Sequence, residues 1–204
     1  MSLFKRLLNP KSGKSKNTDD ASLDKQHSKY YLEKQLPIDE KFTYNFRRNG
    51  GKFLYCENME EVLQAFDNIL MENDWYETDV FCIDEQLTSR FDGYNLKFGH
   101  KAQSSFFLAR CESLIANNGA VLISSNQIKE KKLAELPDNF IIFSTTSQLV
   151  DNIGEGLRII KTRNKNKIPT NITTIQDFET QKEKDFMSYG STTKNLYLLL
   201  LEDL

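Results

Sequence analysis

An Asn-Asn-Gly turn is the first place where this sequence suggests chemistry. Asn117, Asn118 and Gly119 stand between two apolar runs, "SLIA" and "AVLISS". A sharp reversal between two strands requires a residue that tolerates positive φ, and Gly and Asn do so at the lowest steric cost. The backbone N–H groups of such a turn can form a concavity that binds an anion. The turn therefore predicts either an anion-binding loop or simply a tight connection between strands.

Few titratable or nucleophilic side chains occur in a pattern that supports catalysis. Asp84 and Glu85 follow the apolar run "DVFCI", where they could provide a functional carboxylate or a helix cap. His100 alone cannot build a histidine-rich zinc site, and Cys111 has no identifiable base to activate it. No catalytic residue, metal site or cofactor is predicted. The residues favour a binding or accessory protein over an enzyme.

The apolar pattern from about residue 29 onward predicts strands that alternate with helices. Asn58 ends a strand-like run and has Glu61 three residues later, which is the spacing of a helix-capping pair. Further strands are expected at 79–84, from Ser104, from Gly119, after Pro137, at "NITTIQ" and at "NLYLLLL". This alternation predicts an α/β domain with a mostly parallel sheet and helices on both faces.

A long helix is expected to open on the Ser and Thr residues near 146. It would align five apolar residues on one face: Leu149, Val150, Ile153, Leu157 and Ile160. Gly154 and Gly156 fall inside this helix, where they favour a closely packed helix face over a dinucleotide-binding fingerprint.

The first 28 residues differ from the rest and predict a basic, flexible tail, with the folded domain spanning 29–204. Five basic residues precede the first acid: Lys5, Arg6, Lys11, Lys14 and Lys16. The apolar residues among positions 3–8 recur at helical spacing and could rest on an anionic lipid surface or in a protein groove. A frayed leader is the alternative, because one or two helical turns are hardly stable alone. The basic run 161–167 is similarly either a solvated helix end or a patch for an anionic partner.

Composition restricts the class of protein and its partners. The 204 residues are 39% hydrophobic and 27% charged, as in a globular domain with a wet surface. A net charge of -2 provides no global field for nucleic acid, so nucleic-acid binding is not expected. Cys56, Cys82 and Cys111 are widely spaced in apolar surroundings, which indicates reduced thiols and a cytoplasmic location. No segment approaches the roughly 20 apolar residues of a transmembrane helix.

The order of segments resembles the LUD domain of lactate-utilization proteins, formerly a domain of unknown function (DUF162). The resemblance covers roughly residue 50 to residue 204 and rests on "CESLIANNGAVLISS" followed, after a Pro-bounded loop, by "NFIIFSTTSQLVDNI". In the family pattern an acid, a threonine and a glycine close the first turn, and Gly119 retains the last of these. The chain has "NITTIQ" where the family has Gly-Pro-Ser, and it keeps Gly190 where the family has His-Gly-Pro.

The resemblance implies a NagB/RpiA/CoA-transferase-like α/β fold, whose ligands lie beside strand ends. It selects eight residues as one ligand-binding pocket: Asn117, Asn118, Gly119, Thr173, Thr174, Gly190, Ser191 and Thr192. The companion iron–sulfur subunit of the family uses dense cysteine motifs that are not found here, so no iron–sulfur cluster is expected.

Two functional hypotheses follow from these observations. In the first, the LUD-type domain binds a small anionic or phosphorylated metabolite as an accessory factor in lactate or organic-acid utilization. In the second, the protein is an adaptor that docks on a membrane surface or a protein partner through its basic, amphipathic N-terminus. The oligomeric state stays open.

Overall fold

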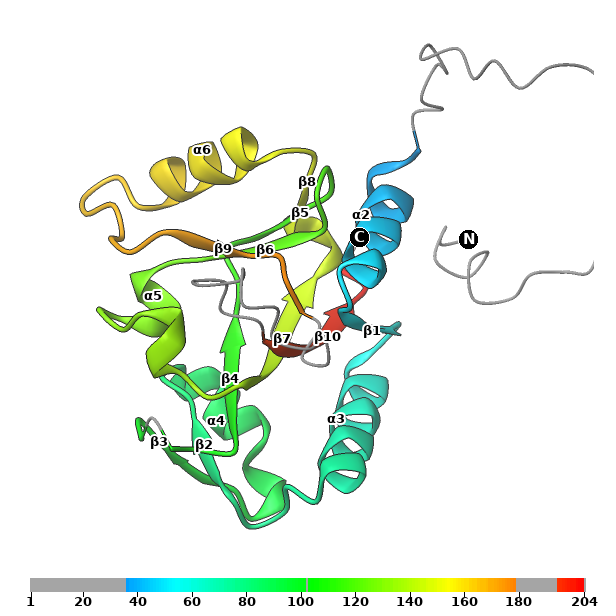
Figure 1. Cartoon of the computed structure of the whole chain (residues 1–204), viewed down its shortest axis with the longest axis vertical. Coiled ribbons are helices and arrows are strands. Elements are labelled where there is room, and N and C mark those ends of the chain that lie inside the picture. Colours follow the sequence, from blue (N-terminus) through cyan, green and yellow to red (C-terminus); the bar gives the residue numbers. More distant parts are fainter. Residues whose placement is uncertain (1–35, 102, 179–193, 204) are drawn as a thin grey trace, which may run out of the picture.

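Six parallel strands form the central sheet, in the order β1-β10-β7-β4-β2-β3 (Figure 1). The structure is a computed structural model that describes residues 36–101, 103–178 and 194–203. At the carboxyl edge of the sheet, Leu201 of β10 is level with Cys56 of β1 and Thr145 of β7. The parallel α/β architecture expected from the sequence is confirmed. The strands are β1 Lys52–Cys56, β2 Asp79–Phe81, β3 Lys97–Gly99, β4 Phe106–Arg110, β7 Asn139–Thr145 and β10 Asn195–Leu201.

A second sheet of four short strands packs against one face of the parallel sheet. Its order is β8-β5-β6-β9, and β6 runs antiparallel to both β5 and β9. Three of these segments, the two runs that flank the Asn117–Gly119 turn and "NITTIQ", were predicted from the sequence, but their assembly into a separate sheet was not. The strands are β5 Ser113–Ile115, β6 Ala120–Ile123, β8 Leu149–Val150 and β9 Thr173–Ile175.

Helices cover both faces of the parallel sheet, as predicted. α3 and α4 pack on one face, whereas α2 and α5 lie on the other face with the second sheet. α6 covers the far side of the second sheet and forms an outer layer (Figure 1). The helices are α2 Ile38–Arg48, α3 Met59–Asn73, α4 Glu85–Arg90, α5 Ser125–Ile128 and α6 Ile153–Arg163, with short 3-10 turns η1 Asp92–Tyr94, η2 Leu133–Glu135 and η3 Thr146–Gln148.

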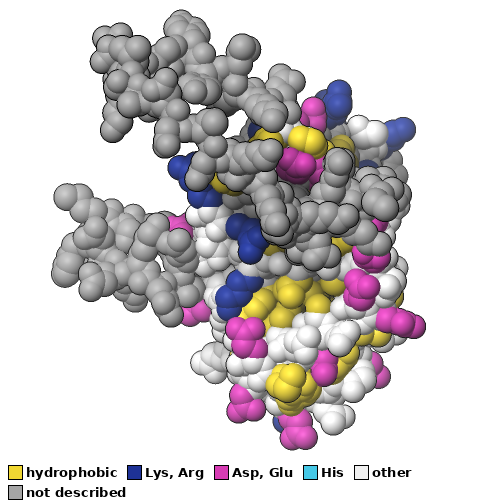
Figure 2. All heavy atoms as spheres, turned by 90° about the vertical axis from the view of Figure 1, so that its right-hand side faces the viewer, with side chains coloured by type: hydrophobic (Ala, Val, Ile, Leu, Met, Phe, Trp, Pro, Cys, Tyr) yellow, Lys and Arg dark blue, Asp and Glu magenta, His cyan; other side chains and the backbone are white. Residues whose placement is uncertain are grey.

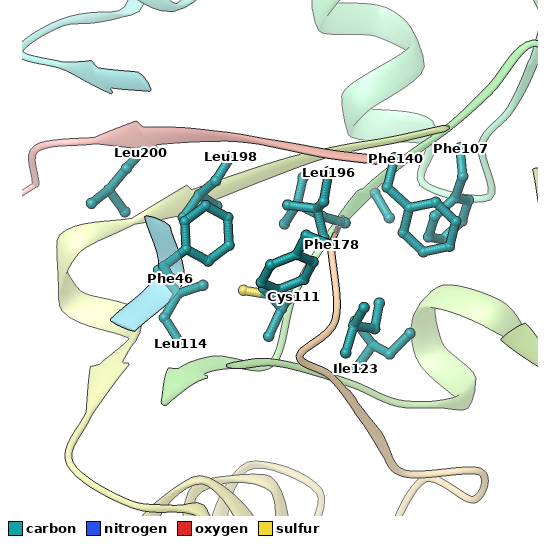
Figure 3. Close-up of a cluster of buried hydrophobic side chains, with 14 of the residues drawn as sticks. Phe46, Phe107, Cys111, Leu114, Ile123, Phe140, Phe178, Leu196, Leu198 and Leu200 are labelled. Atoms are coloured by element: carbon teal, nitrogen blue, oxygen red, sulfur yellow. The ribbon is translucent and has the colours of Figure 1, made fainter. Parts of the chain in front are cut away.

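β10 contributes alternate side chains to two separate cores. Leu196, Leu198 and Leu200 point toward Phe46 and the second sheet (Figure 3). Tyr197 and Leu199 belong to the opposite core, which contains α3. Because successive side chains of a strand face opposite ways, a strand covered on both sides must be apolar throughout. This requirement explains the continuous run "NLYLLLL".

The predicted capping pair at the start of α3 is confirmed. Asn58 is the N-cap, and its Oδ1 accepts a hydrogen bond from the backbone N–H of Glu61 at 2.9 Å. In return, the Glu61 carboxylate accepts from the backbone N–H of Glu57 at 2.8 Å. Such contacts satisfy N–H groups that have no partner within the helix.

The helix expected from position 146 is wrong in its first part. Residues 146–148 form η3, and Leu149 and Val150 form β8, which pairs with Leu114 and Ile115 of β5. α6 begins only at Ile153, because Asn152 caps it by accepting from the backbone N–H of Glu155 at 3.1 Å. Nonlocal strand pairing therefore overrides the helical spacing of the first two apolar residues.

Gly156 confirms the closely packed helix face within α6. A Cβ atom at this position would lie 2.8 Å from Leu122 Cδ2, closer than real side chains approach one another. The absence of a side chain thus allows α6 to lie directly on β6 of the second sheet.

The side of the molecule along which α2 and α3 both lie has a surface of mixed polarity and charge. Figure 2 shows hydrophobic side chains exposed on this side, with most Lys and Arg in its upper half and Asp and Glu spread over its whole height. The large hydrophobic side chains Tyr44 of α2 and Met71 of α3 are 61% and 63% exposed. This face therefore combines both signs of charge with apolar contact area.

Candidate functional site

An open cleft of about 750 Å³ lies at the carboxyl ends of β2, β4 and β7. Open parallel sheets generally bind their ligands in this position, beyond the carboxyl ends of the strands. The cleft extends to α5 and to the end of α6, so helices that pack with the second sheet contribute to its walls. Its charged and amide side chains are Asp84, Arg90, Arg110, Glu112, Asn126, Gln127, Gln148 and Arg163.

Three arginines give the cleft its cationic groups. Arg110, the last residue of β4, donates from Nε to Asp84 Oδ2 at 2.5 Å. Arg90, at the end of α4, places its guanidinium 5.0 Å from the centre of the Phe143 ring. Arg163, at the end of α6, makes no hydrogen bond or ion pair with any residue in the described part of the chain. Arg163 is therefore the cation most available to an anionic ligand.

Asp84 serves the structure and the cleft at once. Its Oδ1 accepts from the backbone N–H groups of Gln86 at 2.9 Å and Leu87 at 3.3 Å, which caps α4. Its Oδ2 binds Arg110 and thereby fixes the guanidinium at the edge of the cleft. The helix cap considered for this acid is thus present, and a functional role of the carboxylate stays a prediction.

Glu112 is a buried carboxylate in the wall between the two sheets. It is 8% exposed, and its Oε1 accepts from Ser124 Oγ at 2.6 Å, Asn126 Nδ2 at 2.9 Å and Gln127 Nε2 at 3.2 Å. Its backbone N–H donates to Leu122 O at 2.8 Å. The side chain and the backbone of Glu112 are therefore both fixed.

Cys111 contributes to the floor of the cleft as a structural thiol. Burial raises the pKa of Cys111 to about 12, and the same effect raises the pKa of Cys82 to about 11. Cys111 Sγ lies 3.3 Å from Ser144 Oγ, and Gln148 Nε2 donates to the Cys111 carbonyl at 2.7 Å. A thiol that stays protonated at neutral pH is a poor nucleophile, so the geometry assigns Cys111 to packing.

Asp203 closes the turn between β7 and η3 beside the cleft. Its carboxylate accepts from Thr146 Oγ1 at 2.9 Å, from the Ser147 N–H at 2.8 Å and from Ser147 Oγ at 2.7 Å. Burial alone would raise the pKa of Asp203, but these hydrogen bonds outweigh burial and lower it. These contacts connect the chain after β10 to the turn that follows β7.

We expect Asp203→Asn to destabilise the protein at neutral pH by about 1 kcal/mol, because an amide binds these three donors less well than a carboxylate. The folded state lowers the pKa of Asp203, so this stability is present above the ordinary aspartate pKa of about 4 and is lost as pH falls through the lowered value. Urea unfolding at pH 7 and at pH 3 measures the difference. A gap between the two proteins that widens toward pH 3 would contradict the assignment.

The predicted Asn117–Gly119 turn connects β5 to β6 and is packed against α2. Asn45 Nδ2 donates to the Ala116 carbonyl at 2.8 Å, and Asn49 Nδ2 donates to the Asn118 carbonyl at 2.7 Å. Gly119 has φ of +64°, as predicted for this turn. A Cβ on Gly119 would lie 2.3 Å from the Phe46 backbone nitrogen. The side of the turn that faces α2 is therefore filled by the protein itself.

Two further contacts hold the same turn. Lys41 Nζ donates to Asn117 Oδ1 and pairs with Asp151 at 3.0 Å, and hydrogen bonding by Lys41 lowers the pKa of Asp151. Asn118 Nδ2 donates to Gln176 Oε1 at 3.1 Å. The side chains of Asn117 and Asn118 therefore both make contacts within the protein.

The structure brings the predicted pocket residues only partly together. Thr174 and Thr173 lie on β9, where they pair with Leu122 and Ile123 of β6. The contact from Asn118 to Gln176 brings the end of β9 next to the turn, although neither threonine lines the cleft. Gly190, Ser191 and Thr192 lie outside the described residues, as do the 1–28 tail and its boundary near residue 29. A ligand site formed by these eight residues stays a prediction.

Most of the residues that line the cleft were not predicted from the sequence. Arg110 ends a strand that was predicted and Glu112 lies just beyond it, so the rule that ligands lie beyond strand ends could have identified them. Gln148 was assigned to a helix. Arg163 belongs to the basic run 161–167, which was predicted as a solvated helix end or a patch for an anionic partner but was not linked to this cleft. Asp84 was identified as a candidate carboxylate, and it does line the cleft.

An open parallel sheet with helices on both faces and a polar cleft at its carboxyl edge defines the class of protein, an α/β domain. The sequence model of the LUD domain matches residues 97–201, about half of the chain, and the chain belongs to this family. A crystal structure of a DUF162 family protein from Deinococcus radiodurans is similar, with a TM-score of 0.56 and 13% sequence identity. The similarity covers 81% of this chain and 96% of that one, and it shows the shared fold. A search of the curated proteins finds no match.

The described residues contain neither a candidate membrane-spanning helix nor a candidate metal site. No helix in residues 36–101, 103–178 or 194–203 is long and apolar enough to cross a membrane. Within the same ranges, no group of three His, Cys, Asp or Glu side chains could hold a metal ion. His100 follows β3 at the sheet edge, with its ring centre 6.0 Å from that of Phe81.

Proposed function

We propose that this LUD-domain protein binds a small anionic or phosphorylated metabolite in the cleft at the carboxyl edge of its parallel sheet. The observation that carries the proposal is the convergence of Arg90, Arg110 and Arg163 with neutral hydrogen-bonding groups in one cleft. Guanidinium groups bind carboxylates and phosphates with paired hydrogen bonds, and their charge persists at any physiological pH.

The proposal is a binding or accessory function rather than an enzymatic one. The cleft contains Cys111, whose pKa burial raises to about 12, and no histidine lines it, so the described residues offer no nucleophile with an adjacent base. A role in lactate or organic-acid utilization follows from the family name, so carboxylic acids belong in the ligand panel. A cytoplasmic location is part of the proposal, supported by three buried free thiols, Cys56, Cys82 and Cys111.

The test is a thermal-shift screen of organic acids, sugar phosphates, nucleotides and CoA derivatives, followed by calorimetric titration of any hit. A ligand at about 100 times its dissociation constant should stabilise the protein by roughly 2.7 kcal/mol. Arg163→Met should weaken binding of the hit by about 10-fold or more, because a hydrogen bond to a charged group contributes about 1.5–3 kcal/mol.

Lys167→Met is the matched control, because Lys167 is an exposed cation that follows α6 but does not line the cleft. It should leave binding nearly unchanged. Equal weakening by both substitutions would indicate a diffuse electrostatic effect and would argue against the cleft as the site. The alternative, docking through the N-terminal tail, stays a prediction, because residues 1–28 lie outside the described chain.

A further inference from the structure

Glu112 differs from the other acid of the cleft in how its charge is balanced. Asp84 is paired with Arg110, whereas Glu112 has no Lys, Arg or His within ion-pair distance in the described part of the chain. The three donors on Glu112, from Ser124, Asn126 and Gln127, are all neutral. A buried carboxylate without a cationic partner is unfavourable unless hydrogen bonds satisfy it, and here neutral donors satisfy only one of its oxygens.

The two oxygens of Glu112 are used unequally. All three donors bind Oε1, and no described residue donates to Oε2. Among the described residues, the buried side-chain polar atoms that lack a partner are Ser113 Oγ and Asn118 Oδ1, so Oε2 is not a fully buried acceptor without a partner. Glu112 lines the cleft, where an Oε2 with free acceptor capacity would meet a ligand.

The position of that oxygen is fixed before any ligand arrives. The Glu112 N–H continues the β5–β6 pairing through Leu122, and the residues that hold Oε1 belong to α5 and its N-cap. Ser124 is itself fixed, because its backbone N–H donates to Gln127 Oε1 at 2.8 Å. The backbone of Glu112 is fixed by Leu122, and its Oε1 is fixed by α5 and the N-cap of α5. The side chain therefore loses little conformational entropy when Oε2 accepts a further hydrogen bond.

We propose that Glu112 Oε2 accepts a hydrogen bond from a hydroxyl or ammonium group of the ligand that the arginines hold by its anionic group. This inference rests on the proposed function and narrows its ligand class to anions that carry such a donor. An anion without the donor would leave Glu112 unpaired next to a second negative charge, which is unfavourable.

Three phosphate monoesters of similar size serve as probes for this selectivity. Glycerol 3-phosphate carries hydroxyl groups, phosphoethanolamine carries an ammonium group, and n-propyl phosphate carries neither. Titration calorimetry on the full chain should show at least about 10-fold tighter binding of one or both donor-bearing probes than of n-propyl phosphate. The tighter of the two identifies the donor as hydroxyl or ammonium.

Glu112→Gln should remove this preference, because the amide can still accept from the α5 residues while its other end becomes a donor. Binding of n-propyl phosphate should stay the same or improve. Glu130→Gln is the matched control, since Glu130 is exposed and does not line the cleft. If Glu112→Gln does not fold, Asn126→Ala removes one of the three donors and should reduce the preference in part.

The outcomes separate this inference from the proposed function. Equal binding of all three probes, weakened by Arg163→Met but unaffected by Glu112→Gln, would overturn the role of Glu112 and leave the anion site standing. Binding of none of the probes or of the wider panel would overturn both. A preference that persists in Glu112→Gln would assign the selectivity to another residue and would also reject the inference.

Discussion

Replacing Gly119 with alanine should lower the free energy of unfolding by about 3 kcal/mol or more. The residue has φ of +64°, a conformation that costs a side-chain-bearing residue about 1–3 kcal/mol. In addition, the new Cβ would lie 2.3 Å from the Phe46 nitrogen and 2.4 Å from the Asn45 carbonyl carbon, so α2 would have to move. Such overpacking typically costs another 1–3 kcal/mol. Chemical denaturation followed by circular dichroism measures the loss.

Gly93→Ala provides a matched control for this substitution. No atom lies within 4 Å of the Cβ that alanine would add at Gly93, so this change should be nearly neutral. If Gly119→Ala is no more destabilising than Gly93→Ala, α2 does not pack on the turn in solution. The turn would then be open to a ligand on that side, as the sequence allowed.

Local signals predicted the elements whose stability depends on neighbours in the sequence. The Asn58–Glu61 pair marked the start of α3 correctly, because both partners of the cap lie within one helical turn. The continuous apolar run of β10 likewise identified a strand buried on both faces. In these segments the local pattern and the final packing agree.

The second sheet could not be predicted in this way, because its strands are short and depend on distant partners. Leu149 and Val150 fit a helical repeat with Ile153, yet their pairing partners are Leu114 and Ile115 of β5. A two-residue strand carries almost no periodicity of its own. The conformation of Leu149 and Val150 is therefore determined by their pairing with β5, which is part of the β5–β6 hairpin.

The same reasoning explains why the candidate site was only partly predicted. The conformation of the Asn117–Gly119 turn was predicted, but α2, which fills one side of it, had no signal in the analysis. Glu112 is held by residues of α5 that become neighbours only when the chain crosses from the parallel sheet to the second sheet. Strand ends were identifiable from sequence, whereas the second wall of the cleft required the tertiary arrangement.

Replacing Lys194 with methionine should destabilise the protein by about 2–3 kcal/mol, although the exchange removes a buried charge. Lys194 is completely buried, and its Nζ donates to the carbonyls of Leu136 at 3.0 Å and Pro137 at 2.9 Å. Methionine fills a similar volume but leaves both carbonyls without this donor, and each unsatisfied buried group costs about 1–3 kcal/mol. Relief of the desolvated ammonium offsets part of that cost.

A second lysine, Lys101, has the same ion-pair distance and distinguishes the contribution of the ion pair from that of the carbonyl contacts. Lys194 pairs with Asp138 at 3.4 Å, and the exposed Lys101 pairs with Asp79 at 3.4 Å. If the ion pair were responsible for the stability, Lys194→Met and Lys101→Met would cost the same. We expect Lys101→Met to change the stability by no more than about 0.5 kcal/mol, because exposed pairs contribute little.

The pH dependence of Lys194→Met provides a second measurement. Burial lowers the pKa of Lys194, so between the lowered value and the ordinary value of about 10.4 the unfolded chain binds a proton that the folded chain does not. The stability that Lys194 contributes therefore increases as pH rises through this window. It is lost as pH falls through the lowered pKa that Lys194 has in the folded state. The gap between wild type and Lys194→Met should widen from pH 7 to pH 10. A gap that narrows over this range would mean that the ammonium is stabilised by its charge, and the carbonyl contacts would then not explain its burial.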